Sequence, residues 1–170
     1  MLCNSEDFAF IALGSNLGDA RKNVLDAIEN LRALGESPLR CSSLWQSTPV
    51  ACPPGSPQFV NAVAGIRPRE GETPESLLDR LQAIERAFGR LPARLRNEPR
   101  PMDLDLICFG RKTRDSTTLV LPHPRAHLRR FVMLPLSEIA PDLILPGQTL
   151  SISQLLSALD TSEELLLLPG

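Results

Sequence analysis

The chain has 170 residues, of which 42% are hydrophobic and 22% charged, and its formal net charge at pH 7 is −2. This composition predicts a single globular domain over residues 1–170 and excludes a disordered chain, while the acidic balance argues against broad nucleic-acid binding. No apolar run approaches the roughly 20 residues of a membrane span, and the N-terminus lacks the apolar stretch of a secretory signal, so we expect a cytoplasmic protein.

The N-terminal part of the chain alternates between strand and helix patterns. In order, we expect a buried strand at 8–13, a turn at 14–19, a helix at 20–34, a strand at 39–46, a Pro- and Gly-rich loop at 47–57 and a strand at 58–66. Gly35 follows the last apolar position of the helix and is predicted to be its C′ residue. The segment G-S-N-L-G at 14–18 lacks the spacing of known phosphate loops, so we interpret it as a tight turn with room to line a pocket.

The remainder of the chain contains a further helix and strand, followed by shorter elements, and shows no internal repeat. In order, we expect a helix from an N-cap at Thr73 to Gly89, an exposed loop at 91–101, a strand at 102–109, a helical turn near 124–127 and a helix near 151–158. The order β-α-β-β-α-β with C-terminal additions predicts an α+β fold, a ferredoxin-like sandwich in which helices pack on an antiparallel sheet. The four cysteines show no C-x-x-C spacing and are expected to be free thiols.

Basic residues gather in one part of the sequence. Between Arg80 and Arg130 there are twelve Lys or Arg and five Asp or Glu, so this segment is positive in a chain that is negative overall. Only Lys22 and Lys112 are lysines, and the planar fork of arginine suits bidentate contacts with phosphate oxygens. A genomic bias toward arginine is an alternative explanation for the excess, although it does not explain the clustering.

The most informative segment is M-D-L-D-L at 102–106. Because side chains alternate across a strand, Asp103 and Asp105 share one face while the apolar residues share the other. Mg²⁺ prefers oxygen ligands and commonly binds through one or two carboxylates plus substrate phosphates. For the D-x-D pattern alone, two solvated acids on an exposed strand are the alternative. The neighbouring arginines favour a metal-phosphate site of the kind used in phosphoryl transfer.

Other polar and aromatic residues allow more than one role. Asn61 is an amide in an apolar strand, where it either points to solvent or reads hydrogen-bonding groups of a ligand. His123 and His127 are four residues apart, but the prolines beside His123 favour a phosphate or hydroxyl contact over a metal site. An ordinary surface histidine is the remaining alternative. The aromatic residues expected in the core are Trp45, Phe59 and Phe131.

Five short segments share their order and spacing with one known family. They are I-A-L-G-S-N-L-G at 11–18, F-V-N-A-V at 59–63, P-R-P-M-D-L-D-L at 99–106, L-P-H-P-R at 121–125 and F-V-M-L-P-L-S-E-I-A-P at 131–141. Through them, nearly the whole chain resembles the 6-hydroxymethyl-7,8-dihydropterin pyrophosphokinases of folate biosynthesis. The resemblance implies transfer of pyrophosphate from ATP to the pterin hydroxymethyl group with release of AMP, assisted by two Mg²⁺ ions.

The resemblance also assigns roles to individual residues. Asp103 and Asp105 match the metal ligands, and Arg90 and Arg100 match catalytic arginines that bind the phosphates and the developing charge. The positions that match ATP contacts are Leu78, Gln82, Glu85, Arg90, Arg100, Leu106, His123 and Arg129. The positions that match the pterin pocket, where aromatic walls hold the ring, are Ser47, Thr48, Val50, Phe59, Asn61 and Phe131.

The chain departs from the family pattern in the arginine-rich loop. Asn97 and Glu98 replace the Trp-Gly or similar pair of many members, and Pro92 replaces an arginine of some, so the closing contacts of this loop are in question. Without the resemblance, the same pattern would support a generic nucleotidyl or phosphoryl transferase. An RNA-binding module of ferredoxin-like fold and an inactive regulatory relative are further alternatives. The expected partners are the two small substrates, with no nucleic acid or membrane, and we expect a monomer that can associate with other folate enzymes.

Overall fold

The computed structural model describes residues 4–48, 54–89 and 99–169 of the chain. The strands of this part are β1 (Ala9–Ser15), β2 (Gly35–Cys41), β3 (Trp45–Ser47), β4 (Phe59–Pro68), β5 (Asp103–Phe109), β6 (Arg114–Asp115), β7 (Val120–Leu121) and β8 (Leu165–Leu167). The helices are α1 (Ala20–Arg32), α2 (Pro74–Ala87), α3 (Arg130–Ile139) and α4 (Ile152–Ala158), with 3₁₀ turns η1 (Ser5–Asp7) and η2 (Ala126–Leu128). The predictions for Val50, Arg90, Pro92, Asn97 and Glu98 fall outside the described residues.

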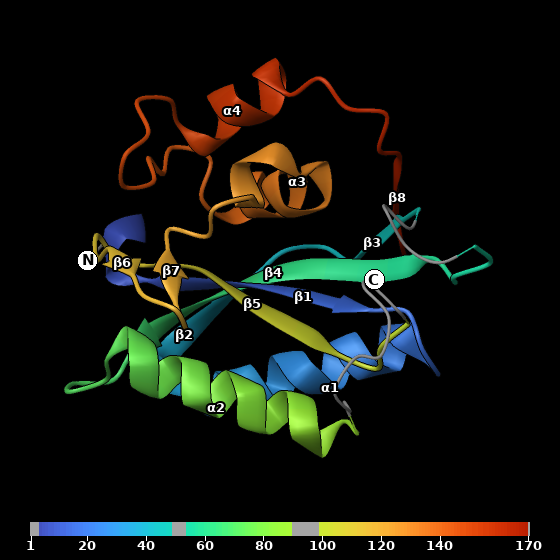
Figure 1. The fold of residues 1–170 in the computed structure, drawn as a ribbon, viewed down its shortest axis with the longest axis horizontal. Coiled ribbons are helices and arrows are strands. Elements are labelled where there is room, and N and C mark those ends of the chain that lie inside the picture. The colour runs from blue at the N-terminus through green and yellow to red at the C-terminus, as the bar shows by residue number, and fades with distance from the viewer. Residues whose placement is uncertain (1–3, 49–53, 90–98, 170) are drawn as a thin grey trace.

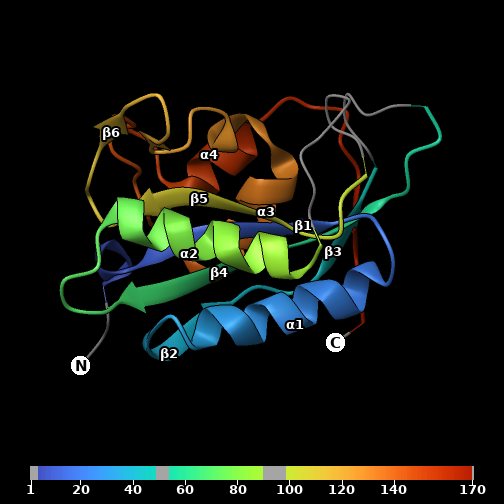
Figure 2. The ribbon, with the colours of Figure 1, turned by 60° about the horizontal axis from the view of Figure 1, so that its bottom comes forward.

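An antiparallel sheet lies between two layers of helices (Figure 1). The strand order is β5-β1-β4-β3-β8, β2 also pairs with β4, and β6 and β7 form a separate small hairpin. Helices α1 and α2 cover one face, which Figure 2 turns toward the viewer, and α3 and α4 cover the other. The ferredoxin-like α+β sandwich predicted from the sequence is confirmed. Its C-terminal additions, α3 and α4, form the second helical layer.

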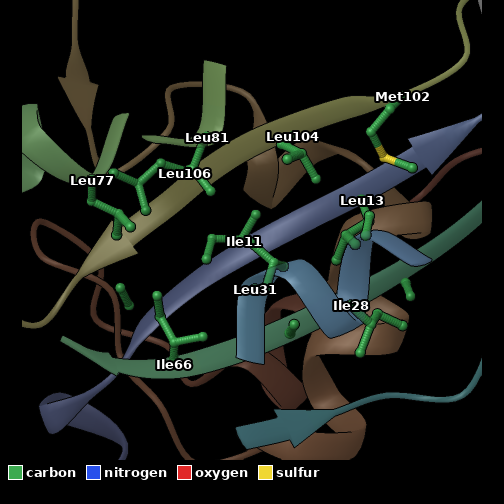
Figure 3. Close-up of a cluster of buried hydrophobic side chains, with 14 of the residues drawn as sticks. Ile11, Leu13, Ile28, Leu31, Ile66, Leu77, Leu81, Met102, Leu104 and Leu106 are labelled. Carbon is green, nitrogen blue, oxygen red and sulfur yellow. The ribbon is translucent and has the colours of Figure 1, made fainter. Parts of the chain in front are cut away.

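Helices α1 and α2 begin at well-formed N-caps. The side chain of Asp19 accepts a hydrogen bond from the N–H of Lys22 at 3.1 Å, and Thr73 forms a capping box with Ser76 ahead of Pro74. The apolar stripes of both helices pack on β1, β4 and β5, as the close-up in Figure 3 shows. The labelled members of this core are Ile11, Leu13, Ile28, Leu31, Ile66, Leu77, Leu81, Met102, Leu104 and Leu106. The core therefore determines which face of β5 points away from α1 and α2.

Two predictions around β2 are wrong. Gly35 is not the C′ residue of α1, because the helix ends earlier and Gly35 opens β2. A Cβ at Gly35 would lie 2.8 Å from the carbonyl oxygen of Arg67, so the close approach of two strands explains this glycine. The strand expected at 39–46 is divided into β2 and β3. At the division, Ser42 Oγ accepts the N–H of Val63 at 2.9 Å, so a side chain takes over one position of the ladder.

The sequence does not predict α3. Its apolar stretch contains Pro135, and a proline inside a helix removes a backbone donor and clashes with the preceding turn. The helix forms because it buries Val132, Met133 and Leu136 in a second core above the sheet. The helix expected near 151–158 is confirmed as α4, whereas β6, β7 and β8 are too short to show a period and are not predicted. No helix in the described part of the chain is long and apolar enough to cross a membrane.

Candidate active site

The alternation predicted for residues 102–106 is present at the start of β5. The apolar members are at most 4% exposed and face the core under the sheet, whereas Asp103 and Asp105 are half-buried on the opposite face. Their Cα atoms are about 7 Å apart along an extended strand. β5 ends the strand order of the sheet, and the two aspartates pair with Gly14 and Ala12 of β1. Two carboxylates thus lie side by side on the α3 face of the sheet.

Arg100 is held beside this pair by its side chain and its backbone. Its Nη1 donates to Asp103 Oδ2 at 3.3 Å, and both side chains are largely buried. The backbone N–H of Arg100 donates to Asn16 Oδ1 at 2.8 Å, and its carbonyl accepts the N–H of Asn16 at 3.1 Å. The arginine that the resemblance assigns to phosphate binding is therefore in direct contact with an expected metal ligand.

Asn16 is a positioning residue that the sequence analysis did not single out. It is 2% exposed, and its Nδ2 donates to the carbonyl of Pro57 at 3.3 Å. One amide therefore joins the turn after β1 to the segments that precede β4 and β5. Asn23 of α1 adds a bond from its Nδ2 to the carbonyl of Pro101 at 3.3 Å. The partners of Asn16 are 41 and 84 residues away in the chain, so no local pattern could have identified them.

Gly14 lies between Asp103 and Asn61 in one row across three strands. On β1 it pairs with Asp103 of β5 on one side and with Asn61 of β4 on the other. Residues that pair directly across strands point to the same face of a sheet, so the carboxylate and the amide both face the α3 layer. A Cβ at Gly14 would lie 3.4 Å from Asn61 Oδ1 and 3.6 Å from the Phe59 ring. The glycine therefore puts no side chain between the two polar groups, and Asn61 and Phe59 lie in contact distance of the position that a Cβ would occupy.

Of the residues expected in the pterin pocket, Ser47 and Phe59 lie beside Asn61 on β3 and β4. The Asn61 side chain is 3% exposed and its Nδ2 donates to Ser47 Oγ at 2.6 Å, which excludes the alternative of a solvent-facing amide. Phe59, two residues before Asn61 on β4, is half-buried, and Thr48 is exposed. Phe131 is half-buried in the first turn of α3, where it packs at the margin of the upper core. The structure thus places polar and aromatic groups from β3, β4 and α3 on one side of the sheet.

His123 and Arg129 line a small hollow that also contains Asp105. Burial lowers the pKa of His123 below its usual 6.5, and the guanidinium groups of Arg129 and Arg125 lower this pKa further. His123 Nδ1 accepts the backbone N–H of Arg125 at 3.1 Å, so the neutral ring carries its proton on Nε2. A neutral imidazole donor and a permanent positive charge therefore share a hollow with a carboxylate.

The remaining ATP positions lie along the edge of the sheet or beneath it. Glu85 accepts the N–H of Leu104 at 2.9 Å and thereby joins α2 to β5. Gln82, one turn earlier on α2, is exposed. Leu78 and Leu106 pack with the core under the sheet, so their side chains lie on the opposite face from the aspartates. The structure thus brings these four positions together with each other, but not with the α3 face.

The site combines two carboxylates and an arginine on one sheet face with a buried amide two strands away. This combination is typical of an enzyme that binds a phosphorylated substrate with a metal ion. The family profile described as 7,8-dihydro-6-hydroxymethylpterin-pyrophosphokinase matches residues 10–141. The 2-amino-4-hydroxy-6-hydroxymethyldihydropteridine pyrophosphokinase of Synechocystis sp. is 37% identical over 164 residues, which cover 95% of this chain and 81% of the relative. The enzyme of that name from Pseudomonas aeruginosa is 41% identical over 138 residues, covering 81% and 83%. This chain belongs to the 7,8-dihydro-6-hydroxymethylpterin-pyrophosphokinase family.

Other relatives are longer proteins. Folic acid synthesis protein fol1 of Pneumocystis carinii is 42% identical over 144 residues, which cover 85% of this chain but 19% of the relative. A solved structure of wild-type Plasmodium falciparum HPPK-DHPS with pteroate superposes with a TM-score of 0.67 at 13% identity, covering 89% of this chain and 42% of that chain. At this identity the likeness supports the fold alone. The chain therefore corresponds to a fraction of these longer proteins.

Proposed function

We propose that this chain transfers the pyrophosphoryl group of ATP to the hydroxymethyl group of 6-hydroxymethyl-7,8-dihydropterin, with release of AMP, and that the α3 face of the sheet is its active site. Family membership supports the reaction, and one observation supports the site: Asp103 and Asn61 share this face, and the residue between them, Gly14, has no side chain. Neighbouring strands are about 4.8 Å apart, so the backbones of β5 and β4 are roughly 10 Å apart here. A bicyclic ring bound at Asn61 can span most of that distance, so that its one-carbon arm points toward the aspartates.

The pterin half of the proposed site recognises the polar edge of the ring. The bond from Asn61 Nδ2 to Ser47 Oγ orients the amide, so Asn61 Oδ1 is the atom that faces Gly14 and can accept ring N–H groups. Phe59 and Phe131 are the aromatic walls between which a planar ring gains dispersion and loses contact with water. We assign the polar backbone that completes this pocket to Ser47, Thr48 and Val50.

The metal half of the proposed site consists of Asp103 and Asp105. Both donors are carboxylate oxygens on one strand face, which suits a hard ion such as Mg²⁺. The described residues contain no group of three or more His, Cys, Asp or Glu side chains that could hold a metal, and Mg²⁺ usually completes its shell with phosphate oxygens and water. We assign two Mg²⁺ ions to the carboxylate pair and the triphosphate. When bound, such ions stabilise the entering and leaving oxygens of an in-line displacement.

The proposed phosphate contacts are Arg90, Arg100, His123 and Arg129. Arg100, which lies 3.3 Å from Asp103, and Arg90 bind the transferred group and its developing charge. Arg129 supplies a permanent positive charge, and neutral His123 can donate from Nε2 to a phosphate oxygen without carrying a charge itself. Groups that are already in place when charge develops lower the barrier more than groups that must first reorganise. We assign the nucleoside side of ATP to Leu78, Gln82, Glu85 and Leu106. These positions are not on the α3 face, so the nucleotide would have to extend from the aspartates around the β5 edge of the sheet.

We also propose that the protein acts as a monomer in the cytoplasm, near other folate enzymes. The support for such proximity is that several relatives are named as folate synthesis bifunctional proteins. One is the folate synthesis bifunctional protein of Arabidopsis thaliana, which is 38% identical over 129 residues, or 26% of that relative. Size-exclusion chromatography with light scattering tests the monomer directly.

AMP formation tests the proposed reaction and its site together. With Mg²⁺ and ATP, we expect AMP to appear only when hydroxymethyl-dihydropterin is added. Asp105→Asn keeps the size of the side chain but removes its charge, and it should lower kcat by roughly 100- to 1,000-fold without loss of thermal stability. Asp115→Asn on the exposed hairpin strand β6 is the matched control and should retain full activity.

Three outcomes would contradict this proposal. AMP release that does not depend on the pterin would favour a different phosphoryl or nucleotidyl transferase. A complete absence of AMP would argue against the reaction. Full activity in Asp105→Asn would leave the reaction intact but reject the carboxylate pair as the metal site.

A further inference from the structure

The N-terminus of α3 is capped by a residue from the far C-terminal segment. The backbone N–H of Arg130 donates to Glu163 Oε2 at 2.9 Å, across 33 residues of sequence. The N-cap residue, Arg129, makes no side-chain capping bond of its own. The first N–H groups of a helix need acceptors, and the positive end of the helix dipole favours a carboxylate there. Glu163 therefore does for α3 what a local N-cap side chain does for α1, α2 and α4.

The backbone that Glu163 holds lies between two proposed site residues. Arg129 and Phe131 are the immediate neighbours of Arg130, and the Arg129 guanidinium lies 5.5 Å from the centre of the Phe131 ring. Arg129 also lines the hollow that contains Asp105. A shift of the first turn of α3 would therefore move a proposed nucleotide contact and a proposed pterin wall at the same time.

The C-terminal segment also contacts the opposite wall of the proposed pterin pocket. Thr161 Oγ1 donates to Glu163 Oε2 at 3.1 Å and accepts the N–H of Glu163 at 3.2 Å, so the carboxylate is held in place. Two residues later β8 begins, and Leu165 pairs with Ser47, which is bonded to Asn61. In Figure 1 this segment descends from α4 in the upper helix layer to β8 beside β3. One short segment thus joins the start of α3 to the strand that supports Asn61.

Two polar atoms of the residues that form this cap have no hydrogen-bond partner in the described part of the chain. Within the described residues, Glu163 Oε1 and Arg130 Nε are buried without a hydrogen-bond partner. Burial of an unpaired polar atom costs free energy, and such an atom in a native structure calls for an explanation. A local serine or threonine would cap the helix without this cost. The arrangement is therefore better explained by the placement of α3 than by helix stability alone.

We propose that Glu163 is a positioning residue for substrate binding: it fixes the first turn of α3, and hence Phe131 and Arg129, relative to the Asn61 wall. This inference rests on the proposed site. Glu163→Ala removes the acceptor and should raise KM for the pterin about tenfold, which corresponds to about 1.4 kcal/mol. KM for ATP should rise about threefold and kcat should stay within about threefold, because the aspartates on β5 are unaffected.

Two further variants separate positioning from a general loss of stability. Glu163→Gln keeps an oxygen that accepts the N–H of Arg130, so its KM for the pterin should lie within about threefold of the wild-type value. Thr73→Ala removes the cap of α2, on the other side of the sheet, where Thr73 Oγ1 accepts the N–H of Ser76 at 3.1 Å. It should lower the thermal midpoint as Glu163→Ala does, yet leave both KM values within twofold.

Steady-state kinetics and thermal denaturation of these variants test the positioning role of Glu163. Phe131→Ala, measured in the same way, tests the proposed pterin pocket itself. A pterin KM that rises no more in Glu163→Ala than in Thr73→Ala would overturn the inference, and so would a failure of Glu163→Gln to restore it. If Phe131→Ala also left KM for the pterin unchanged, the proposed pocket would be wrong as well. A raised KM in Phe131→Ala with an unchanged KM in Glu163→Ala would reject only the role of Glu163.

Discussion

Replacement of Gly14 by alanine would change the floor of the proposed site without a steric conflict inside the protein. Gly14 is buried in β1, and its backbone is not in the left-handed region. The added Cβ would lie 3.4 Å from Asn61 Oδ1 and 3.6 Å from the nearest Phe59 ring atom, which are van der Waals contacts. Alanine in place of glycine at a compatible position stabilises by about 0.4–1 kcal/mol through the unfolded chain. We therefore expect a thermal midpoint that is unchanged or raised by up to about 4 °C.

Substrate binding should respond quite differently. The methyl group projects by roughly one carbon–carbon bond, or about 1.5 Å, into the space between Asn61 and Asp103. A ring displaced by that distance loses its hydrogen bond to Asn61, and a buried polar group left without its partner costs about 1–3 kcal/mol. This corresponds to a factor of about 5 to 150 in affinity. We expect KM for the pterin to rise at least about fivefold in Gly14→Ala, whereas KM for ATP should stay within about threefold.

Gly65→Ala on the paired strand β4 is the matched control. Its Cβ would lie 2.7 Å from Phe10 Cε1 and 3.0 Å from Phe10 Cδ1, inside the core above the sheet. Overpacking of this kind costs about 1–3 kcal/mol, so the thermal midpoint should fall by roughly 2–12 °C. KM for the pterin should not change, because Gly65 is not in the row that contains Asn61 and Asp103. Thermal denaturation and steady-state kinetics on the two variants therefore separate folding from binding.

An unchanged pterin KM in Gly14→Ala, alongside a destabilised Gly65→Ala, would refute the placement of the substrate above Gly14. A loss of stability in Gly14→Ala as large as that in Gly65→Ala would refute the steric argument instead. The placement of the substrate is tested by KM and the steric argument by the thermal midpoint, so each is tested separately.

Two further predictions concern the groups around the aspartates. Asn16→Ala removes the acceptor for the N–H of Arg100 and the donor to the Pro57 carbonyl, so the free energy of unfolding should fall by about 2–4 kcal/mol and kcat/KM should fall at least tenfold. Asn30→Ala, at an exposed position, is the control. Equal unfolding free energies and equal kcat/KM values for the two variants, measured by urea titration and kinetics, would contradict the prediction. Burial and two guanidiniums lower the pKa of His123 in the folded protein, so the unfolded chain binds the proton more readily and stability should be lost as pH falls below about 6.5. Urea midpoints measured at several pH values should show a smaller loss of stability at low pH in His123→Gln than in the wild-type protein. An equal loss in the two proteins would show that a group other than His123 is responsible.

The part of the site on β5 is predictable from the sequence because its pattern is local. A strand with apolar residues at alternate positions has only one face that it can bury, so Asp103 and Asp105 must share the other. The row that joins Asp103 to Asn61 through Gly14 is different. It depends on the register of β1 against two strands that are distant in sequence, and local alternation does not determine that register. The aspartate pair could therefore be predicted, whereas its position relative to Asn61 could not be derived from residue patterns.

Helix α3 shows why the rest of the site is hidden from local reasoning. Pro135 costs about 3 kcal/mol in an isolated helix, and burial of apolar residues under α4 compensates for it only in the folded protein. The acceptor for the first turn, Glu163, comes from another part of the chain. Arg129 and Phe131 are thus positioned by long-range contacts, whereas the aspartates are positioned by the pleat of their own strand. Substitutions far along the sequence should therefore change substrate binding at α3, whereas β5 should keep its aspartates in place as long as its alternation is preserved.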